Sequence, residues 1–387
     1  MNYKHSDEVV LSKVATYVNE KMDSSLLNNS NYVSTENMLP NKGGLVRAET
    51  IPTGKVNRFL KNDILISNIR PYFKKIWYAD KNGGCSADVL TVRSNSEVYS
   101  RYLYYVLMDD FFFEYSMKGS KGTKMPRGDK GHIMNYPIRV PSYKTQQAIA
   151  NILSSLDDKI ELNNKINKNL EELAQTLYKQ WFVDFEFPNK DGEPYKSSGG
   201  EMVESELGLI PKEWYVDLLG NVVNIIYGKN LPTKNLLLKG YPVFGGNGII
   251  GYNDKFLYKN PKVLVSCRGA ASGSVLNSLK NSFVTNNSLI LEDNEKISYE
   301  YLKELSKNRS YFDFVSGSAQ PQVTIASISQ CKIIIPQRKT LNEFTKVMKE
   351  CNEIIENLYY ENLKLAQLRD ELLPKLMSGE IVVPIEE

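Results

Sequence analysis

Two long segments of the chain carry apolar residues at helical spacing. In residues 146–184 the apolar positions lie three and four residues apart in one narrow stripe, which Asn163 and Asn167 interrupt at mid-length. The stripe comprises Ile149, Ile152, Leu156, Ile160, Leu170, Leu173, Leu177 and Trp181. A narrow stripe of this period predicts a long helix with a coiled-coil seam, in which polar residues fix the register at some cost in stability.

The second segment, residues 341–373, matches the first without a gap at an offset of 195 residues. Pro141 meets Pro336, and Thr145, which we expect to cap the first helix, meets Thr340. The match continues upstream, pairing Gly122 with Gly317, Pro126 with Pro321, Ile138 with Ile333 and, at an offset of 199, residues 62–68 with 261–267. This ordered series predicts a tandem duplication, a globular unit followed by a long helix, twice. We expect the matched seams to pair the helices with each other in antiparallel fashion; the alternative is that each helix packs on its own domain.

The segments outside the long helices alternate with the period of strands. Predicted strands lie at residues 63–67, 75–79, 88–92, 136–140, 262–266, 288–292 and 332–336. Short helical patterns lie at 97–116 and 298–315, and the Pro, Gly, Ser and Glu content of residues 188–211 predicts a linker. The pattern therefore predicts two β-rich globular units.

The charge divides along the chain in the same way. The net charge of +3 conceals two basic blocks, residues 1–141 with 20 Lys and Arg against 14 Asp and Glu, and residues 214–335 with 13 against 8. Residues 142–187, 188–213 and 336–387 are acidic. Basic units of this kind suit a polyanion, and a purely structural coiled-coil adaptor would not explain them.

The stretch FGGNGIIGY, residues 244–252, has the G-x-G-x-x-G spacing of a dinucleotide loop and the F-x-G-x-G pattern of many methyltransferases. A dinucleotide loop must open a helix, but Asn253, Asp254, Asn260 and Pro261 break any helix that could follow. A methyltransferase that acts on an amino group would also need an Asn-or-Asp-Pro-Pro-aromatic motif, which the sequence lacks. We therefore expect no bound cofactor and interpret the glycines as a turn-rich loop that lets the backbone and Asn247 approach a partner closely.

The remaining composition offers no catalytic or metal-binding set. Two histidines and four scattered cysteines form no metal-ligand pattern, and the cysteines are expected to be reduced, packed thiols. No apolar run approaches the roughly 20 residues needed to cross a bilayer, and the first residues lack a signal peptide, so a cytoplasmic location without a membrane is expected. The alternative of an adenine methyltransferase acting alone lacks a cofactor site and a target motif.

Several segments resemble one known family. Residues 146–187 look like the central conserved region of specificity subunits of Type I restriction-modification systems, and residues 368–381 resemble the tail of their second conserved region. NYVSTENMLPNKGG, NDILISNIRPYFKKIW, GCSADVL and GTKMPRGDKGHIMNYPI resemble the first target recognition domain, and PVFGGNGIIGY is similar to a loop of the second. The resemblance covers nearly the whole chain.

This resemblance implies a fold and a set of partners. The implied fold class is α+β, with two β-rich target recognition domains in tandem, two long helices in an antiparallel coiled coil, and pseudo-twofold symmetry. The corresponding boundaries are 1–141 for the first target recognition domain, 142–187 for its spacer helix, 188–213 for the linker, 214–336 for the second target recognition domain and 337–387 for the distal helix and tail. The implied role is a non-catalytic subunit that reads a bipartite site in double-stranded DNA. The implied partners are two methylation subunits and restriction subunits that carry the nuclease and the ATP-driven motor.

Base edges in DNA are read by Arg, Lys, Asn and Gln forks, and lysines on phosphates add affinity. Loops rich in such residues are therefore the candidate DNA contacts. In the first unit they lie at 68–75 and 118–130, and the candidates are Arg70, Lys74, Lys121, Lys124 and Arg127. In the second unit they lie at 241–252, 266–274, 285–287 and 316–322, and the candidates are Tyr241, Asn247, Arg268, Asn287, Gln320 and Gln322.

If the paired helices set the distance between the two half-sites, their length acts as a ruler. Four residues inserted after Asn164 add about 6 Å of helical rise and nearly preserve the apolar seam. Because DNA rises about 3.4 Å per base pair, the modified site is expected to keep both half-sites and gain one or two unread base pairs. Methylome sequencing of a host that carries the variant measures the spacer, and an unchanged spacer with a verified longer helix contradicts the ruler.

Overall fold

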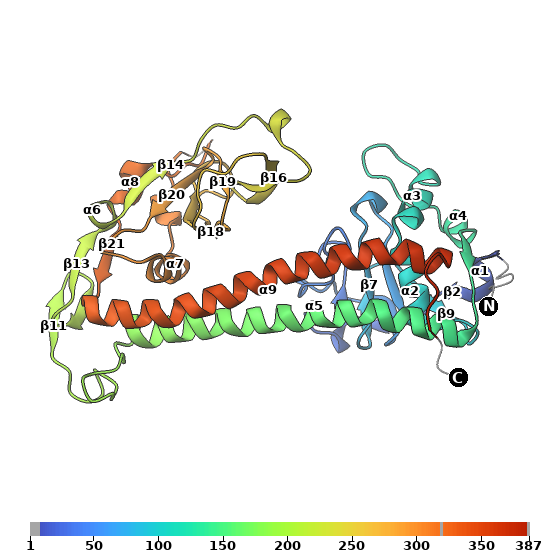
Figure 1. The fold of residues 1–387 in the computed structure, drawn as a ribbon, viewed down its shortest axis with the longest axis horizontal. Coiled ribbons are helices and arrows are strands. Elements are labelled where there is room, and N and C mark those ends of the chain that lie inside the picture. The colour runs from blue at the N-terminus through green and yellow to red at the C-terminus, as the bar shows by residue number, and fades with distance from the viewer. Residues whose placement is uncertain (1–7, 318–319, 385–387) are drawn as a thin grey trace. The chain divides into compact units, whose positions relative to one another are not determined.

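A computed structural model describes residues 8–317 and 320–384 (Figure 1). The chain forms two compact units, the first comprising residues 1–162 and 361–387 and the second residues 163–360. Each unit contains one half of each long helix.

The first unit is built on antiparallel strands. Its first and last strands, β1 (Glu8–Val10) and β10 (Pro137–Arg139), pair with each other. A four-stranded antiparallel sheet has the order β2-β9-β6-β7, with β2 at Ala15–Tyr17, β9 at Val89–Ser94, β6 at Ile64–Ser67 and β7 at Ile76–Tyr78. A second sheet has the order β3-β5-β8-β4, with β3 at Lys21–Asp23, β5 at Lys55–Phe59, β8 at Gly83–Cys85 and β4 at Tyr32–Val33. In this second sheet β4 runs parallel to β8.

Short helices cover the first sheet and close the core of the first unit. They are α1 (Leu11–Val14), α2 (Ser100–Met108), α3 (Asp110–Lys118) and α4 (Lys130–Met134). The sequence predicts a single helix at 97–116, but Asp109 breaks it because its carboxylate accepts a hydrogen bond from the Phe111 amide at 2.9 Å and starts α3. The largest core cluster of this unit joins α2, α3 and the sheet to both long helices through Leu153 and Leu376.

The second unit repeats this plan. Its first and last strands, β13 (Tyr215–Leu218) and β21 (Lys332–Ile335), pair, and its main sheet has the order β14-β20-β17-β18. The sheet contains β14 (Asn224–Tyr227), β20 (Ser288–Glu292), β17 (Val263–Ser266) and β18 (Val275–Asn277). The second sheet places β15 (Tyr241–Gly245) between β16 (Gly248–Asn253) and the parallel β19 (Phe283–Val284). The helices are α6 (Leu219–Val222), α7 (Tyr299–Lys307) and α8 (Ile325–Ser329). The tandem duplication and all seven predicted strands are confirmed.

The segment predicted to be a linker has structure of its own. Within 188–213, β11 (Met202–Ser205) and β12 (Gly208–Pro211) form an antiparallel hairpin. Phe187 stacks on Tyr195 and on Trp214, with ring centroids 4.6 and 5.0 Å apart. This packing ties the segment to the core of the second unit.

Both long helices are present and are antiparallel within each unit. α5 spans Tyr143–Tyr178 and continues as a π-helical turn to Val183, and α9 spans Arg338–Ser378 (Figure 1). In the first unit, Lys159 of α5 lies 3.5 Å from Glu361 of α9. In the second unit, the Asn167 side-chain amide donates to the Ile355 carbonyl of α9 at 3.4 Å.

The seam of α5 differs from the predicted stripe at two positions. Ile152 and Leu173 are 38% and 50% exposed, whereas Leu153 and Ala174 are buried. A seam must alternate steps of four and three residues to stay on one face, and this rule selects Leu153 and Ala174. The resulting seam is Ile149, Leu153, Leu156, Ile160, Asn163, Asn167, Leu170, Ala174, Leu177 and Trp181.

The predicted helix caps are also corrected. The first helix begins at Tyr143, and the Ser142 hydroxyl accepts the hydrogen bond from the Thr145 amide at 3.2 Å. Thr145 therefore lies inside the first turn, where its hydroxyl is 2.7 Å from that of Ser142. Thr340 lies in the first turn of α9, which begins at Arg338.

A charged residue occupies the seam of α9. Arg369, at the position that matches Ala174, donates to the Asp157 carboxylate of α5 at 2.7 Å, and the Tyr105 hydroxyl donates to the same carboxylate at 2.7 Å. Burial opposes the charge of Arg369, but the carboxylates of Asp157 and Asp370 outweigh burial and raise the pKa of the guanidinium. The seam of the first unit thus contains an ion pair in place of an apolar contact.

Replacing Arg369 with Met is expected to destabilise the first unit, because the partly buried Asp157 carboxylate loses its countercharge. Breaking such a pair costs about 2–4 kcal/mol, less than for a fully dry pair since Asp157 is 22% exposed. Urea unfolding followed by circular dichroism measures the loss. The matched control is Lys159→Met, which breaks the exposed pair with Glu361 and is expected to cost less than about 1 kcal/mol. If the two variants lose the same free energy of unfolding, burial does not make the Arg369–Asp157 pair the more important one.

Candidate nucleic-acid interface

Three segments meet at the end of β6 in the first unit. The Asn68 amide donates to the Asp88 carbonyl at 2.9 Å, and the Gly128 amide donates to the Asn68 carbonyl at 3.0 Å. The Arg70 amide donates to the Pro126 carbonyl at 2.8 Å. We name residues 67–70, 86–88 and 121–128 the first loop cluster. Its segments are joined by backbone hydrogen bonds, in which the side chains take no part.

The segment 121–127 of the first loop cluster is a small hairpin that presents basic side chains. Lys121 and Arg127 exchange two backbone hydrogen bonds of 2.9 Å, and Lys124 is exposed between them. Lys121 pairs with Asp129 at 3.0 Å. A backbone hydrogen bond from His132, together with Lys121, lowers the pKa of Asp129, which therefore stays ionised. The hairpin brings three of the predicted contact residues into one place.

Arg70 joins the first loop cluster in an unusual conformation. Its φ angle is +50°, in the left-handed region that residues with a side chain seldom adopt. Its Nε atom, like the Oδ1 atom of Asn68, is buried and has no hydrogen-bond partner among the residues that the structure describes. Strained residues and unpaired buried polar atoms concentrate at functional sites, and both occur here.

Lys74 is not brought into the loop cluster. Its ammonium group lies 2.7 Å from the carboxylate of Asp110 in α3, which also binds Lys42 at 2.8 Å. Burial favours the neutral acid, but the hydrogen bonds from Lys42 and Lys74 outweigh it and lower the pKa of Asp110. The structure thus places Lys74 in an ion-pair network beside the loops.

The second unit has an equivalent second loop cluster, residues 245–248, 266–269, 285–287, 316–317 and 320–323. The Cys267 amide donates to the Asn287 carbonyl at 2.9 Å, and the Val323 amide donates to the Cys267 carbonyl at 3.1 Å. The Gly269 amide donates to the Pro321 carbonyl at 3.0 Å. These bonds repeat those of the first cluster at offsets of 199 and 195 residues. Ser316 and Gln322 exchange two backbone bonds of 2.9 Å, as Lys121 and Arg127 do.

The glycines of residues 244–252 form a tight hairpin turn in this second cluster. Gly246 and Asn247 join β15 directly to β16, so a strand follows the glycines where a dinucleotide loop requires a helix. A Cβ atom added at Gly246 would lie 2.8 Å from the Ser266 hydroxyl and 3.4 Å from the Asn287 carbonyl. A side chain at 246 would therefore displace the Ser266 hydroxyl, and the absence of one lets the turn pack against Ser266 and Asn287.

The other candidates of the second unit are distributed around this cluster. Arg268, Asn287 and Gln322 are exposed within it, and Gln320 is exposed in the hairpin 316–322, whose residues 318 and 319 lie outside the described part of the chain. Tyr241 lies at the opposite end of β15 from the turn, where its ring packs against that of Phe256 at 4.9 Å. Five of the six candidates thus lie together.

Two residues of the first cluster escape prediction from the sequence alone. Asp88 occupies the position of Asn287, and Asn68 that of Cys267. If the offset of 199 residues is applied to residue 88 as well as to residue 68, it identifies Asp88 as the residue equivalent to Asn287. Asp88 lies 3.2 Å from the Arg127 guanidinium.

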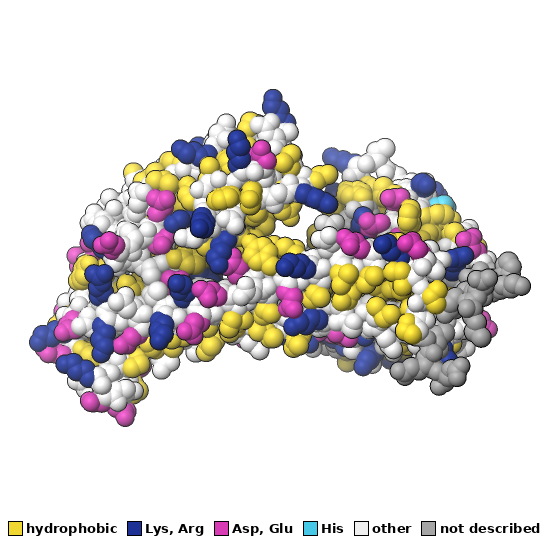
Figure 2. All heavy atoms as spheres, viewed as in Figure 1, with side chains coloured by type: hydrophobic (Ala, Val, Ile, Leu, Met, Phe, Trp, Pro, Cys, Tyr) yellow, Lys and Arg dark blue, Asp and Glu magenta, His cyan; other side chains and the backbone are white. Residues whose placement is uncertain are grey.

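The surface around β16 combines basic and hydrophobic side chains. Figure 2 shows Lys and Arg among hydrophobic side chains over this part of the second unit, with few acidic ones. The exposed residues are Leu237, Leu238, Tyr241, Ile249, Ile250, Tyr252, Phe256 and Leu257, with Lys234, Lys239, Lys255 and Lys259 close to them in sequence. A basic surface with aromatic groups is typical of nucleic-acid contact.

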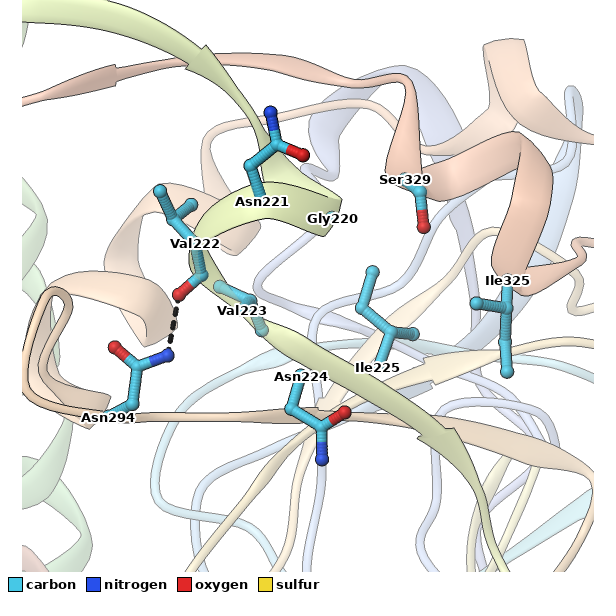
Figure 3. A pocket seen from close by; sticks show the side chains of 9 residues that line it. All are labelled: Gly220, Asn221, Val222, Val223, Asn224, Ile225, Asn294, Ile325 and Ser329. Atoms are coloured by element: carbon cyan, nitrogen blue, oxygen red, sulfur yellow. Dashed lines mark hydrogen bonds between the residues drawn. The ribbon is translucent and has the colours of Figure 1, made fainter.

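One hollow of the second unit lies away from the loop cluster. Gly220, Asn221, Asn224, Asn294 and Ser329 contribute to its lining (Figure 3), and its volume is about 430 Å³. The Asn294 side chain closes one side by donating to the Val222 carbonyl at 2.7 Å. Its lining residues include no charged side chain. Asn294 follows the last residue of β20, whereas Asn287 of the loop cluster precedes the first, so the hollow and the cluster lie at opposite ends of this strand.

The thiols are buried, as expected from the sequence. All four cysteines are free, and burial raises the pKa of the Cys85 thiol to about 11. Across residues 8–317 and 320–384, no cluster of His, Cys, Asp and Glu has the form of a metal site. The same part of the chain contains no helix of sufficient length and apolarity to cross a membrane.

Comparison with known proteins agrees with this architecture. Residues 6–172 and 211–364 both match the family described as Type I restriction modification DNA specificity domain. The chain is 25% identical to the HindI specificity subunit of Haemophilus influenzae, over 97% of this chain and 99% of that protein. It is 30% identical to the MjaIX specificity subunit of Methanocaldococcus jannaschii, over 74% of this chain and 70% of that protein. The fold is similar to that of the S subunit of a Type I restriction-modification system from M. genitalium, with a TM-score of 0.58, 20% identity and 97% of each chain covered.

Because the two family matches cover most of the chain, one in each repeat, this protein belongs to the Type I restriction-modification DNA specificity family and is a non-catalytic specificity subunit.

Proposed function

We propose that the chain reads a bipartite DNA sequence, with one half-site bound by each loop cluster. The observation that carries this proposal is the repetition of one backbone arrangement with different side chains. The Ile69–Arg127 bridge of the first cluster corresponds to the Arg268–Gln322 bridge of the second. Two domains that bind different short DNA sequences can share one backbone arrangement, provided that the polar side chains facing the bases differ between them.

The charges of the two clusters support binding to duplex DNA. The side chains of Lys121 and Arg127 are 83% and 58% exposed, so both can reach phosphates or base edges. The second unit adds Arg268 and the lysines around β16. Arg70, Lys74, Lys124, Tyr241, Asn247, Asn287, Gln320 and Gln322 complete the proposed set of contacts.

The proposed partners follow from the role of a specificity subunit. The chain provides recognition, two methylation subunits provide the methyl donor and the transfer chemistry, and restriction subunits provide the nuclease and the ATP-driven motor. The buried, free thiols are consistent with a reducing cytoplasm. The complex is proposed to act there on the chromosome and on incoming DNA.

Exchange of residues 1–141 for those of a related subunit is expected to change only one half of the recognised site. The junction precedes α5, so the helix and the second loop cluster keep their sequence. Methylome sequencing of a host with the exchanged subunit measures the outcome. Exchange of residues 214–336 is the matched control and is expected to change the other half alone. A change of both halves after either exchange contradicts the assignment of one half-site to each unit.

Removal of two lysines from the first loop cluster tests the electrostatic contribution. The double variant Lys121→Ala, Lys124→Ala is expected to weaken binding to target and non-target duplexes alike. The slope of log K against log salt should fall by about 2 in magnitude if each lysine neutralises one phosphate. Titrations of the chain with its methylation subunits at several salt concentrations measure this slope.

The matched control for this titration is Lys61→Ala, Lys81→Ala. Both control residues flank the opposite end of the β6–β7 hairpin from the loop cluster. If the slope changes equally in the two double variants, Lys121 and Lys124 of the first loop cluster make no specific phosphate contacts.

A further inference from the structure

The two loop clusters differ at one pair of equivalent positions in a chemically specific way. The first pair is Asp88 and Arg127, and the second is Asn287 and Gln322. Asp88 and Asn287 accept the equivalent backbone hydrogen bonds, from Asn68 and Cys267, both at 2.9 Å. Arg127 and Gln322 form the equivalent β-bridges. A charged pair in one unit is therefore replaced by an amide pair in the other.

In the first unit the carboxylate orients the guanidinium. Asp88 Oδ1 lies 3.2 Å from Arg127 Nη2, and the two side chains are 39% and 58% exposed. The contact occupies one edge of the guanidinium fork and leaves its other donors available. An arginine held in this way loses less rotamer freedom on binding, and its planar fork matches the O6 and N7 acceptors of guanine in the major groove.

In the second unit the corresponding side chain is a neutral fork. Gln322 is exposed, and its amide offers a donor NH2 group beside an acceptor oxygen. This combination matches the N7 acceptor and N6 donor of adenine rather than the two acceptors of guanine. Asn287 occupies the position equivalent to Asp88, so the second unit lacks the carboxylate that orients an arginine in the first unit.

We propose that Arg127 and Gln322 are equivalent specificity-determining residues, which read a guanine in one half-site and an adenine in the other. Asp88 is the positioning residue that orients Arg127. This inference rests on the proposed function and adds the chemical identity of one base in each half-site. The backbone bonds of both clusters are independent of these side chains, so the two readers are interchangeable.

Selection from randomised DNA duplexes tests this interchange without relying on methylation. The chain in complex with its methylation subunits is the selecting agent, and the enriched sequences are determined for the wild type and for Arg127→Gln. The wild type is expected to enrich a bipartite motif with a guanine that the variant replaces by adenine at the same position. The preference for guanine over adenine at that position should change on the order of 10- to 100-fold.

The reciprocal variant, Asn287→Asp with Gln322→Arg, moves the charged pair into the second unit. It is expected to convert one adenine of the other half-site to guanine. Lys81→Gln, at the opposite end of the β6–β7 hairpin, is the control and should leave the motif unchanged. In every variant the half-site of the unmodified unit reports that the complex remains folded and binds DNA.

The outcomes separate this inference from the proposed function. If the wild type enriches no bipartite motif, the proposed function fails. If the wild type enriches a bipartite motif, three results overturn only the specificity assignment. The substitutions leave every position of the motif unchanged, they alter both half-sites, or they change a base other than guanine and adenine. A switch confined to one position of the expected half supports it.

Asp88 is tested by its own pair of variants. Asp88→Ala should reduce the guanine preference at the position read by Arg127, without changing other positions, and Asp88→Glu should restore it because the carboxylate is retained. A merely structural role predicts a general loss of binding to both half-sites, with no recovery in the glutamate variant. That result would overturn the positioning role.

Discussion

The two long helices are constrained by a seam that alternates steps of four and three residues. In α5 this seam runs from Ile149 to Trp181, and in α9 the equivalent positions, 195 residues later, run from Phe344 to Leu376. Both units need this seam because their largest core clusters contain residues of both helices, Leu153 with Leu376 in the first and Trp181 with Phe344 in the second. A change of step in either helix would rotate core residues into solvent. The phase of the helices is therefore fixed by the packing within each unit.

The loop clusters are constrained differently. Their segments are held by backbone hydrogen bonds, and the turns depend on a few special positions such as Gly122 and Gly317, with φ angles of +94° and +88°. Because these bonds do not involve side chains, residues such as Arg127 and Gln322 can differ without altering the loops. The backbone of these residues determines the loop structure, and their side chains determine which chemical groups the loops present.

Periodicity and self-comparison predicted the architecture, but tertiary contacts decided its details. The duplication, the seven predicted strands and the long helices follow from patterns that extend over many residues. The errors at Ile152 and Leu173 arose because steps of three and four fit equally well locally, and only the partner helix selects the face. The ion pair of Lys74 with Asp110 could not be predicted, because the two residues lie 36 positions apart in sequence and α3 brings them together. Asp88 was missed since an acidic residue is not an expected DNA contact, and its ion pair with Arg127 forms only when the two loops come together.

The discontinuity of the first unit has a consequence for folding during synthesis. Residues 361–387 complete a unit whose other residues end at 162, so Ile149 and Leu153 join Leu373 and Leu376 in one core only after the whole second unit has been made. Contacts of such long sequence separation form late and slowly. Until then the apolar face of the nascent α5 is exposed to solvent and to chaperones. The second unit, residues 163–360, is continuous in sequence and can close before the segment after residue 360 completes the first unit.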